Sequence, residues 1–305
     1  MAASTQSPKE NHVACTLPSG YVARPAQRED VPRAVALFNT CSEHLTGESP
    51  NSENDLRVEW SAPAFDLTRD TRVVLSPDGH LVGYAEVWDT APPHVVAYLW
   101  ARVHPDHRRQ GIGSFLLAWQ EARARQAVDK APSHARVVMR AGALDRDRAS
   151  IQMLEGHGFT PVRQFFRMLL EMNAPPADAV WPAGVTVRTF VRSDLEETVR
   201  ATRDAFSDHW GHVDTPFDQE LEEMAHWIDT DEDFDPLFWY LAETEGRIVG
   251  VALCTPKRYE DPSLGWIHTL GVRRPWRRRG IALALLQHAM FHLYHRGKTR
   301  VGLGV

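Results

Sequence analysis

The hydrophobic positions of the chain change spacing repeatedly, from the two-residue alternation of strands to the wider spacing of helices. The run from Val31 to Phe38 places apolar side chains on one helical face. A Pro-Asp-Gly turn at 77–79, between two apolar runs, indicates a β-hairpin. In the first half the spacing predicts strands at 22–24, 72–75, 81–88, 95–103, 136–140 and 164–172, and helices at 30–41, 113–126 and 148–155.

The same order of elements occurs a second time. The run Val103–Gly113 aligns without a gap with Val272–Ala282. Two shorter matches precede it at similar offsets in both halves. They pair Gly20–Arg24 with Gly184–Arg188, and Gly79–Gly83 with Gly246–Gly250. Two related α/β units therefore follow each other in the chain.

These repeats divide the chain into four parts. We expect a flexible N-terminal tail at 1–18, a first domain at 19–172, a linker rich in Pro and Ala at 173–183, and a second domain at 184–305. The second copy stops within the strand that corresponds to 136–140, so roughly 30 residues of helix and strand lack a counterpart. Either this copy is truncated, or it is completed in another way.

Composition narrows the class of protein. The formal net charge of -6 and a pI near 6.2 disfavour general binding to nucleic acid. No apolar run approaches the length of a membrane span, and the N-terminus lacks the apolar core of a secretion signal. Cys15, Cys41 and Cys254 are too widely spaced for a disulfide framework or a zinc site. A soluble protein of the reducing cytoplasm is expected.

Each repeat carries a glycine turn between a strand and a helix. Glycine lets the backbone approach a ligand closely, and the unpaired N–H groups at the helix start attract an anion such as a pyrophosphate. Arg108 and Arg277 would add a planar cation beside the phosphates. One such turn could be a simple strand-to-helix connection with solvated arginines, but two in the same context favour phosphate binding. The turn residues are Arg108, Arg109, Gln110, Gly111, Ile112 and Gly113, and Arg277, Arg278, Arg279, Gly280, Ile281 and Ala282.

Both turns match the Arg/Gln-x-x-Gly-x-Gly/Ala motif of the GNAT superfamily of acyl-CoA-dependent N-acyltransferases, which the sequence resembles over nearly all of 20–305. The tandem layout resembles that of mycothiol synthase and its relatives, as do the runs Ala205–Gly211 and Asp233–Pro236. The resemblance implies two mixed, mostly antiparallel sheets flanked by helices, acetyl-CoA as cosubstrate, and no metal. It also implies that main-chain groups of the strand before each turn hold the pantetheine, at Ala101, Arg102 and Val103 and at Leu270, Gly271 and Val272.

The resemblance also points to the proton-transfer groups. The family's usual base position is His268 in the second copy, with a pKa that could lie near neutrality, and Leu99 in the first. The usual acid position is Leu154 in the first copy and lies beyond Val305 in the second. Glu86 is a substitute base in the first copy, unless it is a satisfied structural glutamate. His268 also has a possible structural role, because a histidine on a strand can simply form hydrogen bonds with its neighbours.

Other polar groups are candidates for the acceptor site. Asp208, His209 and Trp210 follow a helical stretch, where they form either an acceptor pocket or a helix cap with a packed tryptophan. The acidic run at 229–235 would attract a cationic amine, although a solvated loop is the simpler explanation. His288, His292 and His295 share a helix face but lack the cysteine or carboxylate neighbours of a metal site.

The expected function is transfer of an acetyl group from acetyl-CoA to a primary amine of a small molecule, in the second domain, with a degenerate first domain in support. The segment Thr255–Glu260 departs from the substrate-facing run expected in mycothiol synthase, which favours a different acceptor. Two alternatives are a non-catalytic acyl-CoA-binding or sensing protein and a protein N-acetyltransferase. Acceptor identity and oligomeric state are not predicted.

Overall fold

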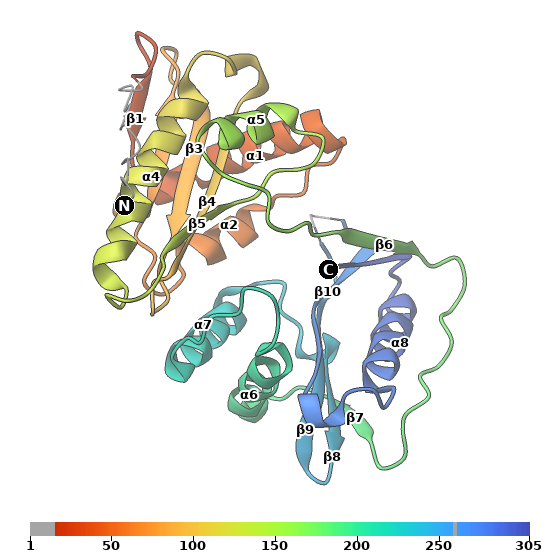
Figure 1. Cartoon of the computed structure of the whole chain (residues 1–305). Helices are drawn as coiled ribbons and strands as arrows, with labels where there is room; N and C mark the ends of the chain where they lie inside the picture. The colour runs from red at the N-terminus through yellow and green to blue at the C-terminus, as the bar shows by residue number, and fades with distance from the viewer. Residues whose placement is uncertain (1–15, 259–260) are drawn as a thin grey trace, which may run out of the picture.

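The chain forms two separate β-sheets, each with helices on both faces (Figure 1). The structure is a computed structural model that describes residues 16–258 and 261–305. Most of the predicted tail, including Cys15, lies outside the described residues. The two sheets and their flanking helices confirm the two α/β units expected from the repeat.

The first sheet has the strand order β1-β2-β3-β4-β5, and only the contact between β4 and β5 is parallel. The second sheet has the order β6-β11-β10-β9-β8-β7, with one parallel contact between β10 and β11. Both sheets are therefore mixed and mostly antiparallel. The strands are β1 (Val22–Arg24), β2 (Thr71–Leu75), β3 (Leu81–Trp88), β4 (Val96–Val103), β5 (Val138–Ala141), β6 (Arg167–Glu171), β7 (Thr186–Thr189), β8 (Trp239–Thr244), β9 (Arg247–Thr255), β10 (Leu264–Val272) and β11 (Arg300–Gly304).

Helices cover the two faces of each sheet because strand side chains alternate in direction. Along β3, Tyr84 packs in the apolar layer of α1, whereas Ala85 packs in that of α4. Along β8, Tyr240 packs with α8, and Leu241 packs with α6 and α7. The helices are α1 (Val31–Thr46), α2 (Glu53–Trp60), α3 (Leu67–Asp70), α4 (Ile112–Lys130), α5 (Arg148–Gly156), α6 (Leu195–Phe206), α7 (Phe217–Thr230) and α8 (Ile281–His295), with 3-10 turns at Arg28–Asp30, Pro105–His107, Arg192–Asp194, Pro236–Phe238 and Arg274–Trp276. Among the described residues, no helix is both long and apolar enough to cross a membrane.

The strand predicted at 164–172 forms, but it belongs to the second sheet. β6 pairs antiparallel with β11, and Arg167 lies opposite Gly304. The repeat predicts that this strand belongs to the first copy, whereas the structure places it beside the last strand of the second (Figure 1). Its apolar residues predict a strand correctly. The strand with which β6 pairs depends on the free edge of β11, and the local spacing of apolar residues does not specify that edge.

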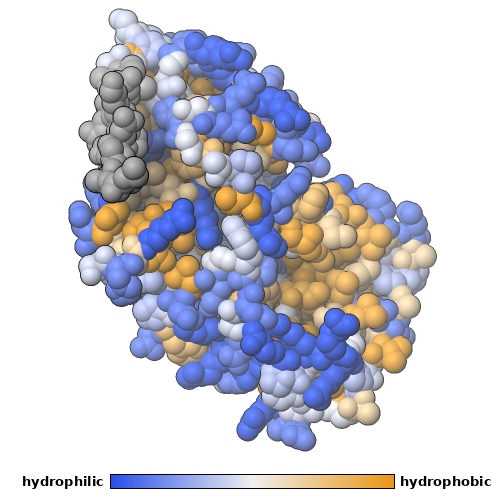
Figure 2. All heavy atoms as spheres, in the orientation of Figure 1, coloured by the Kyte–Doolittle hydropathy of each residue, from blue (hydrophilic) through white to orange (hydrophobic). Residues whose placement is uncertain are grey.

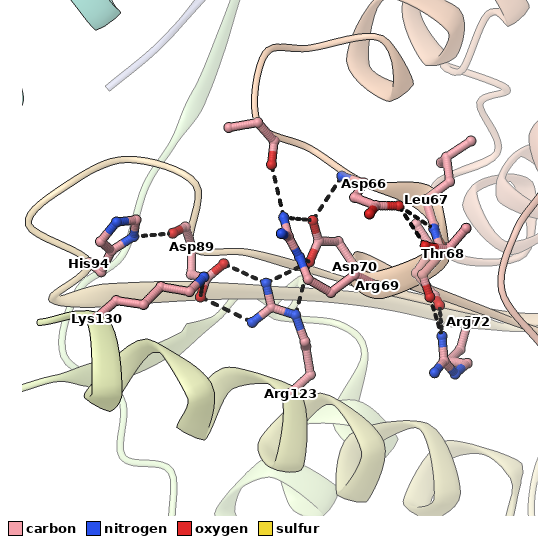
Figure 3. A network of polar contacts seen from close by, with 12 residues as sticks. Asp66, Leu67, Thr68, Arg69, Asp70, Arg72, Asp89, His94, Arg123 and Lys130 are labelled. Atoms are coloured by element: carbon pink, nitrogen blue, oxygen red, sulfur yellow. Dashed lines mark hydrogen bonds and ion pairs between the residues drawn. The ribbon is translucent and has the colours of Figure 1, made fainter.

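A buried ionic network fastens α4 to the first sheet (Figure 3). The Arg123 guanidinium donates to Asp70 at 2.5 Å and to Asp89 at 2.6 Å, and all three side chains are almost fully buried. Lys130 adds a bond to Asp89 at 3.0 Å, and Arg69 pairs with Asp70 at 2.7 Å. Burial would raise the pKa of Asp89, but the bonds from Arg123 and Lys130 hold it below its usual range. The network joins α3, α4 and the end of β3.

Candidate active site

The two glycine turns have almost the same backbone. Gly111 and Gly280 cap their helices with φ of 85° and 86°. Arg109 and Arg278 also take positive φ, at 62° and 63°. Each turn leads directly into the start of a helix, whose first N–H groups have no partner within the helix and suit an anion. The local geometry of the sequence-predicted turns is thus present in both repeats.

Both central strands separate from their parallel neighbours before they reach the turn. β4 pairs with β5 only from Val96 to Leu99. β10 pairs with β11 only from Leu264 to Ile267. The predicted pantetheine segments, at 101–103 and 270–272, therefore lie outside the stretch paired with the parallel neighbour. The carbonyls of Ala101, Val103 and Val272 accept bonds from arginine side chains instead.

The turn arginine of the second repeat is engaged within the protein. Arg277 donates to both carboxylate oxygens of Asp208, at 2.6 and 2.7 Å, and to the carbonyls of Ala205 and Val272. Arg274 contacts the same carboxylate at 3.0 Å. These bonds hold the pKa of Asp208 far below its usual range. Arg277 and Asp208 thus tie the turn to the end of α6.

A β-bulge interrupts β10 at His268. Ile267 pairs with Cys254 and Thr269 with Leu253, so His268 is the extra residue of its strand. Bulges of this kind redirect a side chain and are frequent at active sites. In the first repeat, β4 pairs with β3 without a shift, and Leu99 is buried in the core. The two copies therefore differ at the position where the resemblance expects a base.

His268 is held by the end of β9. Its Nε2 atom lies 3.0 Å from Thr255 Oγ1, and that hydroxyl donates to the carbonyl of Lys257 at 3.0 Å. Because the hydroxyl proton goes to Lys257, Nε2 is the donor to Thr255, and Nδ1 keeps the lone pair. Although His268 is exposed to solvent on one side, the protein atoms around it and then the nearby Arg258 cation lower its pKa to about 4. The expected pKa near neutrality is thus corrected downward, and the imidazole is neutral at pH 7.

His268 opens into a cavity between the two repeats. Its volume is about 50 Å³. Asn54 of α2 donates to Asp231 at 2.8 Å, and Ser61 lies 3.2 Å from His226 Nε2, so α2 is held against α7. The first repeat thereby supplies part of the wall. The lining residues are Ser52, Asp55, Trp227, Asp231, Asp233, Thr255, Lys257, Arg258 and His268.

Three carboxylates and two cations line this cavity. Asp233 pairs with Lys257 at 3.0 Å. Burial raises the pKa of Asp55, and the neighbouring Asp231 and Asp233 raise it further, while Arg258 opposes them. A cationic group would relieve this repulsion. The acidic run at 229–235, for which sequence analysis left a solvated loop open, therefore contributes to a cavity wall.

The other sequence-predicted acceptor residues lie elsewhere. His209 packs edge-on against Phe206, and Trp210 lies under the guanidinium of Arg140 at 4.8 Å. Neither they nor Asp208 lines the cavity of His268. Glu86 is buried in the first repeat, where it accepts a bond from Tyr84 at 2.6 Å. Its burial raises its pKa.

Sequence reasoning did not single out Thr255 or the α2 residues Ser52 and Asp55 as parts of the site. The segment that begins at Thr255 had been noted only as a departure from a related enzyme. Nothing local to α2 indicates that it faces the other repeat. Such a contact becomes visible only when both repeats are placed in space.

Comparison with known proteins identifies the relatives of this chain. The model of the Acetyltransferase (GNAT) family matches residues 34–159 and 199–305. A mycothiol acetyltransferase of Saccharopolyspora erythraea is 30% identical over 241 residues, which cover 76% of each chain. One of Saccharomonospora viridis is 32% identical over 301 residues, which cover 92% of this chain and 87% of that protein. A GCN5-related N-acetyltransferase from Sphaerobacter thermophilus superposes with a TM-score of 0.76 at 32% identity, covering 95% of this chain and 88% of that one.

Proposed function

Since this chain belongs to the GNAT acetyltransferase family, we propose that it moves the acetyl group of acetyl-CoA to a primary amine of a small molecule bound between its two repeats. The acceptor lies in the cavity of His268, and the second repeat carries out the reaction. The mycothiol acetyltransferases it resembles are named for a small-molecule acceptor, which supports this choice.

The observation that carries the proposal is the bulge at His268. It turns a neutral imidazole into the cavity beside the place where β10 leaves β11. The equivalent position of the first repeat holds a buried leucine on an unbroken strand. Proton transfer is therefore assigned to one repeat, although both retain the anion-binding turn.

The residues of the second repeat have distinct roles in this reaction. When bound, acetyl-CoA supplies a thioester whose carbonyl carbon accepts an amine. The turn at 277–282 and the unpaired edge at 270–272 fit its pyrophosphate and pantetheine. His268 Nδ1 takes the proton that the acceptor's ammonium must lose before its nitrogen can attack. Asp55, Asp231 and Asp233 draw the cationic acceptor toward that imidazole.

Acetyl transfer to small amines tests the function directly. Release of CoA thiol should appear with small primary amines and not with peptides that carry only a free N-terminus. Replacing Asp55 with asparagine should raise KM about fivefold and leave kcat nearly unchanged, because one attracting charge is lost. Glu53→Gln, on the same helix but outside the cavity lining, is the matched control. Binding of acetyl-CoA without CoA release from any amine would contradict the proposal.

Calorimetric titration of acetyl-CoA tells which turn binds it. Arg277→Ala should abolish binding at the second repeat, because the turn loses its tie to Asp208 and the cation beside the phosphates. Arg274→Ala is the control, since it removes a bond to the same carboxylate but leaves the turn intact. Loss of binding only in Arg108→Ala would reverse the assignment of the working repeat.

A further inference from the structure

A pocket in the first repeat shares no lining residue with the cavity of His268. It lies between α1, the start of β3 and the 3-10 turn that follows β4, and its volume is about 360 Å³. This volume is within the range of pockets that hold small organic ligands. None of its described lining residues belongs to 101–103 or 108–113, where acetyl-CoA is expected in this repeat. The pocket is therefore a candidate for a separate ligand.

Basic and apolar side chains line this pocket. Its polar lining residues are Arg33, Thr40, His80, His104 and His107, and no carboxylate is among the lining residues that the structure describes. Arg33 donates one N–H to the carbonyl of Gly79. Asp30 lies 3.6 Å from Arg33 but accepts its two short bonds, at 2.6 and 2.7 Å, from Arg24. Because a guanidinium has five N–H donors, Arg33 can offer others to a ligand.

Two carboxylates lie close to the pocket without lining it. Asp78 is 3.4 Å from His80, and Asp106 is 3.9 Å from His104. Both of these aspartates are mostly exposed, so water screens their charge. Figure 2 shows a mainly hydrophilic surface in its upper part, where Figure 1 draws the first repeat. The pocket thus keeps a basic lining within a repeat whose surface there is polar.

Hydrogen bonds fix which nitrogen of each imidazole carries the proton. The Tyr21 hydroxyl donates to Gln110 at 3.0 Å, so His107 Nδ1, at 2.8 Å, donates to that hydroxyl and His107 Nε2 keeps its lone pair. The Asp106 amide donates to His104 Nδ1 at 3.3 Å, so His104 Nε2 carries the proton. Beside the guanidinium, the pocket therefore offers one imidazole donor and one imidazole acceptor.

The second repeat closes the equivalent place with its own side chains. The first turns of α1 and α6 align without a gap, because the ion pairs Arg24–Asp30 and Arg188–Asp194 have the same spacing. Arg33, Thr40 and His104 then correspond to Glu197, Asp204 and Arg273.

Arg273 lies 2.7 Å from Glu197 and 3.5 Å from Asp204, and its side chain is only 12% exposed. In the second repeat one guanidinium thus meets two carboxylates. In the first repeat an arginine has replaced one acid and a threonine the other, so the lining lacks the negative charge that would complete it. An anion from solution can supply that charge.

We propose that this pocket binds a small organic phosphate that also carries hydroxyl groups. Arg33 and His104 Nε2 donate to the phosphate, and His107 Nε2 accepts from a hydroxyl. The apolar side chains of the lining pack against the carbon skeleton. A phosphate monoester carries nearly two negative charges at pH 7 and three acceptor oxygens, which suit a guanidinium and several imidazoles better than one carboxylate does.

Calorimetric titration of glucose 6-phosphate into the full chain, with saturating acetyl-CoA present, tests this site. The wild type should bind the sugar phosphate. Glucose and inorganic phosphate should each bind at least about tenfold more weakly, because one lacks the phosphate and the other the hydroxylated skeleton. Arg33→Ala should weaken binding by at least about tenfold, since a charge-assisted bond is lost. Arg28→Ala, at an exposed arginine outside the pocket, should bind like the wild type.

A double variant copies the second repeat into the first. Arg33→Glu/His104→Arg should form the ion pair that Glu197 and Arg273 form, and it should abolish binding of glucose 6-phosphate while the circular dichroism spectrum stays unchanged. No binding to the wild type, or full binding to this variant, would overturn the proposal. Binding that acetyl-CoA displaces, or that Arg108→Ala removes, would overturn it as well, because the phosphate would then occupy a glycine turn.

Discussion

Replacing His268 with alanine should lower kcat by about 10² to 10⁴-fold while acetyl-CoA still binds. This range is the usual contribution of a positioned base. Binding should survive because the turn at 277–282 and the unpaired edge of β10 do not depend on the imidazole. Steady-state release of CoA thiol gives kcat, and calorimetry gives the affinity for acetyl-CoA. His295→Ala, an exposed histidine on α8, is the control and should retain full activity.

The pH profile separates a base from a structural histidine. The protein atoms around His268 and the Arg258 cation lower its pKa to about 4. Below that pH the imidazole is protonated and cannot accept the ammonium proton, so activity should rise as pH increases through about 4. His268→Ala should lose this limb of the profile. An unchanged profile, or unchanged kcat, would remove His268 from the mechanism.

Replacing Arg123 with alanine should destabilise the protein by about 3–5 kcal/mol, because two buried carboxylates lose their shared buried cation and keep only the more exposed Arg69 and Lys130. Arg123 bridges Asp70 and Asp89, and both carboxylates are fully buried. Neither could reach solvent when the guanidinium is removed. Chemical denaturation followed by circular dichroism measures the loss. Arg125, two residues away, is exposed and pairs with Glu121 at 3.5 Å, so Arg125→Ala should change stability by less than about 0.5 kcal/mol.

The stabilisation by this network also depends on pH. The pKa of Asp89 is lowered in the folded state, so its contribution is complete above the unfolded pKa and disappears as pH falls through the folded one. The difference between wild type and Arg123→Ala should therefore shrink in acid. A difference below about 1 kcal/mol at neutral pH would mean that the network contributes little.

Much of the molecule follows from local sequence patterns. The duplicated run around Gly111 and Gly280 predicted two turns, and both adopt the same left-handed backbone. Most predicted strands and helices also form near their expected positions, because their spacing and turn residues act within a few residues. The contrast between Leu99 and His268 was likewise readable from the alignment of the two repeats. The binding of acetyl-CoA to the turns stays a prediction.

Other features depended on contacts between distant segments. The bulge at His268 arises from its register with β9, which local spacing does not specify. The cavity contains Asp55 because α2 lies against α7 of the other repeat. Arg277 meets Asp208 across a gap of 69 residues.

The chain by itself thus determined the repeat, the strand and helix pattern and the two left-handed glycine turns. Tertiary structure decided that β6 joins the second sheet, that the repeats enclose a shared cavity, and that His268 has a lowered pKa. The physical reason is the distance along the sequence over which each kind of interaction acts. Backbone propensities and turns act between neighbours in sequence, whereas strand pairing, burial and electrostatics depend on which surfaces meet in space.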